Sequence, residues 1–273
     1  MRAQIVTLLT FALVLVWTKL AVMPQVSDRD RAKIMELLSA EEFKNLERLE
    51  LLKMGDMTKT VLQDILREGK NPFLIARALM MLGEVFQDPQ SLDLILPLLR
   101  HPDKEVRGRA AVALRYISEE SDIPMLIQLL NDKDAFARFA AAMALSELGN
   151  PEALPFLKSL LAQIHPIDRH SIERAIKCIE IWNSPQRNKE LQIAVLNLDN
   201  DRELARWAMR KIKKLRLKDA LPILKKALEK VRPAHSADRL RMEMEILSAI
   251  RALGGTLTKE ELKKLEEYPP ETL

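Results

Sequence analysis

The chain has 273 residues, a net charge of +4, 48% hydrophobic but only 4% aromatic residues, and seven glycines. Its length permits a sizeable core in one domain or two, and its many Leu, Ala, Met, Lys, Glu and Arg residues favour helix over strand. The single cysteine excludes an intrachain disulfide and a Cys-rich zinc site. We therefore expect an all-α protein.

Residues 1–26 form a hydrophobic N-terminal segment. Arg2 precedes an almost wholly apolar run over residues 5–17, which has the length of a signal-peptide core. Residues 3–23 reach the roughly 20 residues needed to span a bilayer, because the amine of Lys19 can extend to the interface. We predict an uncleaved signal-anchor, a single N-terminal hydrophobic helix that attaches the protein to a membrane through residues 3–23.

Two alternatives for this segment stay open, a cleaved signal with secretion of the body and a buried soluble helix. The candidate cleavage site after Ala21 places Lys19 at position −3, where a small residue is needed. The topology is also open, because the basic residues that follow the segment favour a cytoplasmic body by the positive-inside rule. We expect export to the periplasmic or extracytoplasmic side.

A short region, residues 27–56, precedes the main body and is predicted to form N-terminal capping helices. The tetrapeptide Ser-Ala-Glu-Glu at 39–42 has the pattern of a capping box, in which a serine and a later glutamate satisfy free backbone groups where a helix opens. The same pattern, Thr-Lys-Glu-Glu at 258–261, predicts a capping helix in the C-terminal region, residues 256–273. End caps of this kind are needed in repeat arrays.

The body, residues 57–255, is an internal repeat. The leucine-rich lines LDLILPLLRH, IPMLIQLLND and LPFLKSLLAQ begin at residues 92, 123 and 154, which are 31 residues apart, and related lines begin at 58, 191 and 221. Alanine-rich lines with helical spacing alternate with them, over residues 106–117, 137–148, 172–182, 204–215 and 242–253. Each unit is therefore a pair of short helices, and about six pairs follow one another.

Capping residues and prolines support these helix boundaries. Asn71, Asp88 and Asn150 each stand before a proline at the expected start of a helix. Glycines follow the last apolar residue of three second helices, which is the C′ position favoured by glycine; they are Gly83, Gly149 and Gly254.

The pattern resembles the HEAT-like repeats of the phycobilisome-lyase type, best over residues 123–161 and 103–114. The resemblance implies an α-α superhelix, and it implies that Arg107 and Arg138, which share a column, bond within a ladder along the turns. Units four to six lose this arginine, so we expect irregular geometry there. Some proteins with such repeats are metal-dependent hydroxylases with paired His-Glu steps and others are chromophore lyases, but this chain has no His-Glu dipeptide.

No residue pattern identifies catalytic, cofactor-binding or metal-binding residues. The four histidines are not spaced as a ligand set, and the pair His170 and Glu173 is interpreted as a capping or solvated pair. Cys178 aligns with Ala113 and Ala144 in the second helices, so we expect a small buried side chain. We therefore expect no cofactor and no enzyme activity.

Second helices of such solenoids line the concave face, where partners bind. Aligning them gives a surface that changes from apolar to basic. The candidate partner-binding residues are Phe136, Phe139, Met143, Lys177, Arg206, Trp207, Arg210 and Lys213. An alternative is that the phenylalanines only pack between repeats.

Residues 206–232 contain 11 basic and 2 acidic residues. Nucleic acid, an anionic lipid surface or plain solvation each explain such a run. We disfavour nucleic acid because the body is nearly neutral and a membrane anchor holds it away from most nucleic acid. Within Arg210–Lys218 we expect Ile212 and Leu215 in the core and the basic residues facing water.

These observations predict a membrane-anchored, non-catalytic scaffold that binds a partner protein on the concave face of a HEAT-like solenoid. The alternatives are a hydroxylase or lyase relative, and a protein that binds nucleic acid or anionic lipid through its basic C-terminal repeats.

Overall fold

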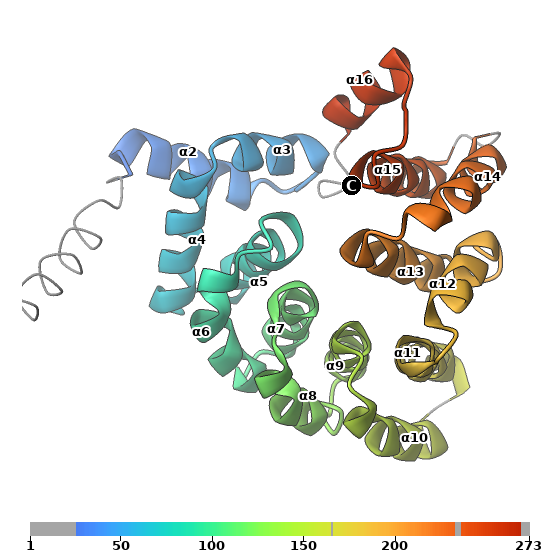
Figure 1. Cartoon of the computed structure of the whole chain (residues 1–273). Helices are drawn as coiled ribbons and strands as arrows, with labels where there is room; N and C mark the ends of the chain where they lie inside the picture. Colours follow the sequence, from blue (N-terminus) through green and yellow to red (C-terminus); the bar gives the residue numbers. More distant parts are fainter. Residues whose placement is uncertain (1–25, 165, 233–235, 269–273) are drawn as a thin grey trace, which may run out of the picture.

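The computed structural model describes residues 26–164, 166–232 and 236–268, and within them every regular element is helical. The helices form a curved solenoid of two layers (Figure 1). No helix of the described part is both long and apolar enough to cross a membrane. The predicted N-terminal hydrophobic helix, residues 3–23, lies outside the described residues.

Six helix pairs make up the solenoid in the described part of the chain, as the repeat lines predicted. In each pair the first helix lies on the outer side of the arc and the second on the inner side (Figure 1). The outer helices are α4 (Asp56–Glu68), α6 (Leu92–Ile95), α8 (Ile123–Leu129), α10 (Leu154–Gln163), α12 (Arg187–Leu196) and α14 (Leu221–Val231). The inner helices are α5 (Pro72–Met80), α7 (Lys104–Ile117), α9 (Ala135–Leu148), α11 (Pro166–Asn183), α13 (Arg202–Leu215) and α15 (Ala237–Ala252).

Short helical turns and end helices complete this arrangement. 3₁₀ turns precede or extend several outer helices: η2 (Pro89–Ser91), η3 (Leu96–Arg100), η4 (Glu120–Asp122), η5 (Pro151–Ala153) and η6 (Lys218–Ala220). A π-helical turn, η1 (Met81–Val85), extends α5. The array begins with α2 (Asp28–Ser39) and α3 (Asn45–Lys53), and α16 (Lys259–Glu267) follows it.

Local capping signals placed most helix ends correctly. The side chain of Asn71 accepts hydrogen bonds from the backbone at the start of α5, and Asn150 does so before η5. Gly149 (φ 74°) and Gly254 (φ 79°) adopt the left-handed conformation that ends a helix. Thr258 opens α16 with a capping box, as predicted.

Two boundary predictions were wrong. Ser39 does not open a helix but ends α2, and the next helix starts only at Asn45. Gly83 is not a C′ glycine, because the chain continues through it as the π-helical turn η1. A Cβ atom at Gly83 would lie 2.3 Å from the Cα of Ala113. Glycine is therefore needed there because the backbones of η1 and α7 approach closely, not because a helix ends.

The predicted arginine ladder is present in the second and third repeats. Arg107 donates to the backbone oxygens of His101 and Pro102, and Arg138 donates to those of Asp132 and Lys133. Arg107 also forms two bonds to the Asp132 carboxylate, of 2.7 and 2.8 Å, which join one turn to the next. These arginines satisfy turn carbonyls that no helix uses.

The apolar core divides into two clusters that meet on α11. One extends from Ile34 to Ile179 and the other from Cys178 to Leu265. Cys178 is fully buried, as predicted for a small core residue, and Ile212 lies in the second cluster with Leu215 packed against it. The interior of the described solenoid is therefore built in two parts that adjoin at α11.

Candidate functional site

The inner helices of the C-terminal half turn back toward those of the N-terminal half. Trp207 of α13 is fully buried, and its indole donates to the backbone oxygen of Ser146 in α9, over 3.3 Å. Next to it Lys211 is only 2% exposed. Its amine donates to the backbone oxygen of Glu147 and lies 4.8 Å from the ring centroid of Trp182. Helix α13 is thus attached to α9, two repeats earlier.

Glu147 is the centre of this contact. Its two carboxylate oxygens pair with Arg210 at 3.0 Å and Lys211 at 2.9 Å, and Arg115 of α7 lies 3.9 Å away. Burial alone would raise the pKa of Glu147, but the three cations outweigh it and lower the pKa to about 2. Glu147 is therefore ionised at neutral pH, and one carboxylate serves three cations.

A second charged network joins α13 to α15. Arg206, whose side chain is 8% exposed, pairs with Glu203 at 2.6 Å and with Asp238 at 2.8 Å. Glu245 lies 3.5 Å from its Nε and 3.6 Å from Arg241. Burial alone would lower the pKa of Arg206, but these carboxylates outweigh it and raise the pKa. The network holds the two inner helices in register.

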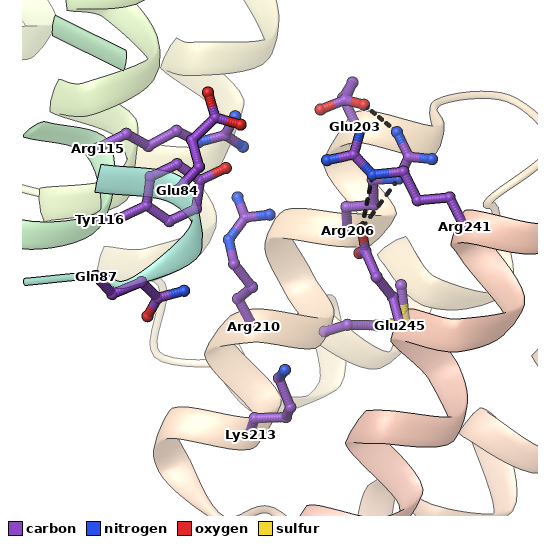
Figure 2. A pocket seen from close by; sticks show the side chains of 11 residues that line it. Glu84, Gln87, Arg115, Tyr116, Glu203, Arg206, Arg210, Lys213, Arg241 and Glu245 are labelled. Atoms are coloured by element: carbon purple, nitrogen blue, oxygen red, sulfur yellow. Dashed lines mark hydrogen bonds and ion pairs between the residues drawn. The ribbon is translucent and has the colours of Figure 1, made fainter. Parts of the chain in front are cut away.

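Between these networks lies a cavity of about 90 Å³, which we call the inner cavity (Figure 2). Its charged and hydroxyl-bearing lining residues are Glu84, Arg115, Tyr116, Glu203, Arg206, Arg210, Lys213, Arg241 and Glu245. Arg210 and Lys213 extend from α13 into the space that faces Arg115 and Tyr116 (Figure 2). The cavity is thus lined by helices from both halves of the chain.

The eight residues predicted as a partner surface are not one open surface. Trp207 is fully buried and Met143 is 3% exposed, so neither offers a side chain to a partner. Both residues were predicted to lie on the concave face. Aligning the second helices assigns each residue to a face, but it does not give the curvature of the solenoid. Lys211, expected to face water with the other basic residues of its stretch, is inside as well.

The other predicted residues divide between two places. Arg206, Arg210 and Lys213 line the inner cavity. Phe136 and Phe139 are partly buried and Lys177 is exposed. The Phe136 ring lies 5.4 Å from the Arg109 guanidinium, so it adjoins a second hollow.

This second hollow, which we call the Phe–Arg groove, has a volume of about 630 Å³ and lies between α3, α5 and α7. Its main lining residues are Phe43, Arg48, Phe73, Arg77, Met80 and Arg109. The Arg77 guanidinium lies 4.1 Å from the ring centroid of Phe73 and 4.9 Å from that of Phe43. Phe73 is 50% exposed although it is a large apolar residue. An aromatic face rimmed by arginines is typical of interaction sites.

Sequence reasoning missed Glu147, Arg115 and Phe73. Glu147 ends an otherwise alanine-rich line, and a lone acid at such a position is a usable signal for a buried ion pair. Arg115 lies among predicted core positions of α7, and a charged residue there is also a signal for a buried ion pair. Phe73 follows a helix-opening proline, where an exposed aromatic has no role in capping.

The described residues contain no group of three or more His, Cys, Asp or Glu residues placed to hold a metal. His170 is exposed and lies 3.8 Å from Asp201, whereas Glu173 pairs with Arg169 at 3.7 Å. Burial raises the pKa of the Cys178 thiol to about 12, so it is protonated and unreactive at neutral pH.

The two curved layers of helices define the class of the protein, which is an α-solenoid. Residues 60–134 and 98–177 match the model for HEAT repeats, so this part of the chain carries HEAT repeats, as its 31-residue lines predicted. No curated protein matches the sequence.

The solved structures that match the chain include two of different kinds. One is the complex of CpcE and CpcF of phycocyanin lyase from Nostoc sp. PCC7120, with a TM-score of 0.51 and 17% identity over 90% of this chain and 94% of that chain. The other is an engineered protein of the Northeast Structural Genomics Consortium, 18% identical over 83% of this chain and 98% of that chain, with a TM-score of 0.29. The first similarity confirms the predicted type of HEAT-like fold.

Proposed function

We propose that the protein is a non-catalytic scaffold that binds a partner protein through the Phe–Arg groove on the inner layer of its HEAT repeats. The groove carries the proposal, because Phe73 leaves half of a large apolar side chain in water. Water contact of an aromatic ring costs free energy that a partner's side chains remove. Aromatic residues and arginine are also the residue types enriched at protein interfaces.

The size of the groove and a fixed arginine support binding at this place. Its volume of about 630 Å³ lies within the roughly 300–1,000 Å³ of ordinary ligand sites. Arg77 is held by the backbone oxygens of Leu38 and Ala40, so it is fixed in position before a partner arrives. A fixed side chain loses little entropy on binding. The similarity to a lyase built as a complex of two chains, CpcE and CpcF, supports a partner by analogy of fold alone.

Photo-crosslinking tests this proposal. A photoreactive phenylalanine analogue replaces Phe73 in one full-length variant and Phe156 in another. Phe156 is the matched control, since it is 49% exposed but lies on the outer helix α10. We expect a discrete adduct of one partner from position 73 and none from position 156. Equal labelling from both positions, or none from 73, contradicts the proposal.

Membrane attachment through residues 3–23 is part of the same proposal, with the body on the exported side. The full chain should stay with membranes after salt and alkaline washing, and a variant without residues 3–23 should be released. Protease added to intact cells and to opened cells then tests the side on which the body lies. A full chain that washes off with salt alone contradicts the anchor.

The alternatives differ in what they require. A lyase or hydroxylase relative requires a chromophore or metal site, and its activity is tested by pigment transfer and by metal analysis of the purified chain. Binding to nucleic acid or anionic lipid requires an exposed basic face. Arg206, Arg210 and Lys211 are turned inward, which leaves such a face to exposed residues beyond them, such as Lys214, Arg216 and Lys218.

A further inference from the structure

The inner cavity has an excess of buried positive charge on its α7 and α13 side. Three cations line the cavity there, Arg115, Arg210 and Lys213, and a fourth, Lys211, lies beside them and pairs with Glu147. Two carboxylates face them, Glu147 and Glu84. The remaining acids of the lining, Glu203 and Glu245, are engaged with Arg206 and Arg241. The local excess is therefore two positive charges.

Some hydrogen-bond donors of the arginines that line the cavity are also left unused. Among the described residues, the Nε and Nη2 atoms of Arg115 and the Nε atom of Arg210 are buried without a hydrogen-bond partner. A buried donor without an acceptor destabilises the fold, more so when it is charged. Burial and the nearby Arg210 lower the pKa of Arg115, whereas at Arg210 burial is outweighed by Glu147 and the pKa is raised, so Arg115 carries the less compensated charge of the two.

We propose that the inner cavity binds a small oxyanion of the phosphate class, held by Arg115, Arg210 and Lys213. A phosphate dianion compensates the excess of two charges. Its tetrahedral oxygens accept bonds from several directions at once, which suits donors that arrive from two different helices. The Tyr116 hydroxyl adds a further donor at the same wall.

The size of the cavity limits the ligand. A water molecule needs about 10–15 Å³ of such space, so about 90 Å³ admits a phosphoryl group but not a whole nucleotide. The exposed residue Gln87 lies at the rim. The ligand is therefore either free inorganic phosphate or the phosphoryl end of a monoester that enters past Gln87. The site is separate from the Phe–Arg groove and does not depend on the proposed scaffold role.

Calorimetric titration of the full chain in detergent tests the site with two probes, inorganic phosphate and phenyl phosphate, against sodium chloride at equal ionic strength. We expect saturable binding of at least one probe. Binding of phosphate alone indicates a free ion, and binding of phenyl phosphate at least as tight indicates a monoester. No saturable heat with either probe overturns the proposal.

Neighbouring lysines provide matched variants. Lys213 lines the cavity, whereas Lys214 is exposed on the same turn of α13 and does not. We expect Lys213→Ser to weaken binding on the order of tenfold, as for loss of one charge-assisted hydrogen bond. Lys214→Ser should leave the affinity unchanged. Arg115→Gln is a second cavity variant, and it should abolish binding while circular dichroism stays that of the unmodified protein. Equal affinities for the Lys213 and Lys214 variants overturn the proposal.

Discussion

The two halves of the solenoid use the same helix pair but are held together in different ways. In both halves neighbouring repeats pack through apolar side chains, and an arginine binds the turn of the next repeat, as Arg107 binds Asp132 and Arg174 binds Asp201. From α11 to α15, buried ion pairs join the inner helices, and α13 reaches back to α9 across an interval of more than sixty residues. The first half is a regular array, and the second half closes it.

This difference explains what the sequence could and could not predict. The number of helix pairs, their inner and outer sides, and caps such as Asn71 and Gly149 depend on neighbouring residues or on one repeat and the next. The contacts of Trp207 and Lys211 depend on the curvature summed over several repeats. No single repeat encodes that sum. The basic residues of Arg210–Lys218 were therefore predicted to face water, although Lys211 makes an internal contact.

The Phe–Arg groove shows the same limit. Arg77 and Phe73 lie on α5, but Phe43 comes from the loop before α3 and Arg109 from α7. Sequence reasoning placed Phe136 on the partner surface, and it adjoins this groove through Arg109. It did not find the groove itself, because residues 39–42 were predicted to open a helix, whereas the structure has a loop between α2 and α3.

Glu147→Gln should cause the largest loss of stability, because Glu147 joins the two halves of the solenoid. It leaves Arg115, Arg210 and Lys211 without their shared carboxylate, and removing one partner of a buried ion pair costs about 3–5 kcal/mol. Urea denaturation should show this loss, whereas Glu152→Gln, at an exposed site, should change stability by less than about 0.5 kcal/mol. Equal effects of the two changes would mean that the halves are not joined at Glu147.

The lowered pKa of Glu147 also predicts how the stability of the protein depends on pH. The pKa of Glu147 is about 2 in the folded chain against 4.5 for an unperturbed glutamate. A lowered pKa contributes stability that is complete above pH 4.5 and is lost as the pH falls through 2, about 3 kcal/mol in total. Denaturation of the unmodified protein between these pH values should be steeper than that of Glu147→Gln. Parallel curves would contradict the assignment.

A smaller effect is expected in the regular half, from Gly83→Ala. The added Cβ meets the backbone of Ala113 at 2.3 Å, which cannot move aside, so we expect a loss of about 2–3 kcal/mol. Gly108→Ala is the matched change, because its Cβ meets only the ring of Phe136, at 2.2 Å. That ring is partly exposed and can turn, and alanine also favours helix by about 1 kcal/mol. Thermal denaturation should rank Gly83→Ala clearly below Gly108→Ala, and the reverse order would refute the close approach of η1 and α7.

Substitutions in the arginine ladder should have the smallest effects on stability. Arg107→Gln removes two bonds to the Asp132 carboxylate and should cost about 2 kcal/mol. Arg138→Gln removes bonds to backbone oxygens only and should cost about 1 kcal/mol. Chemical denaturation of both variants measures the difference. If the two losses are equal, the bond between repeats adds nothing to the ladder.

Amine labelling of the native full chain, read by mass spectrometry, tests the closure of the solenoid most directly. Lys211 and Lys214 lie one turn apart on α13, but the first is buried against Glu147 and the second is exposed. We predict rapid modification of Lys214, and modification of Lys211 only under conditions that unfold the chain. Equal rates at the two lysines in the folded protein would contradict the closed arrangement of α13 on α9.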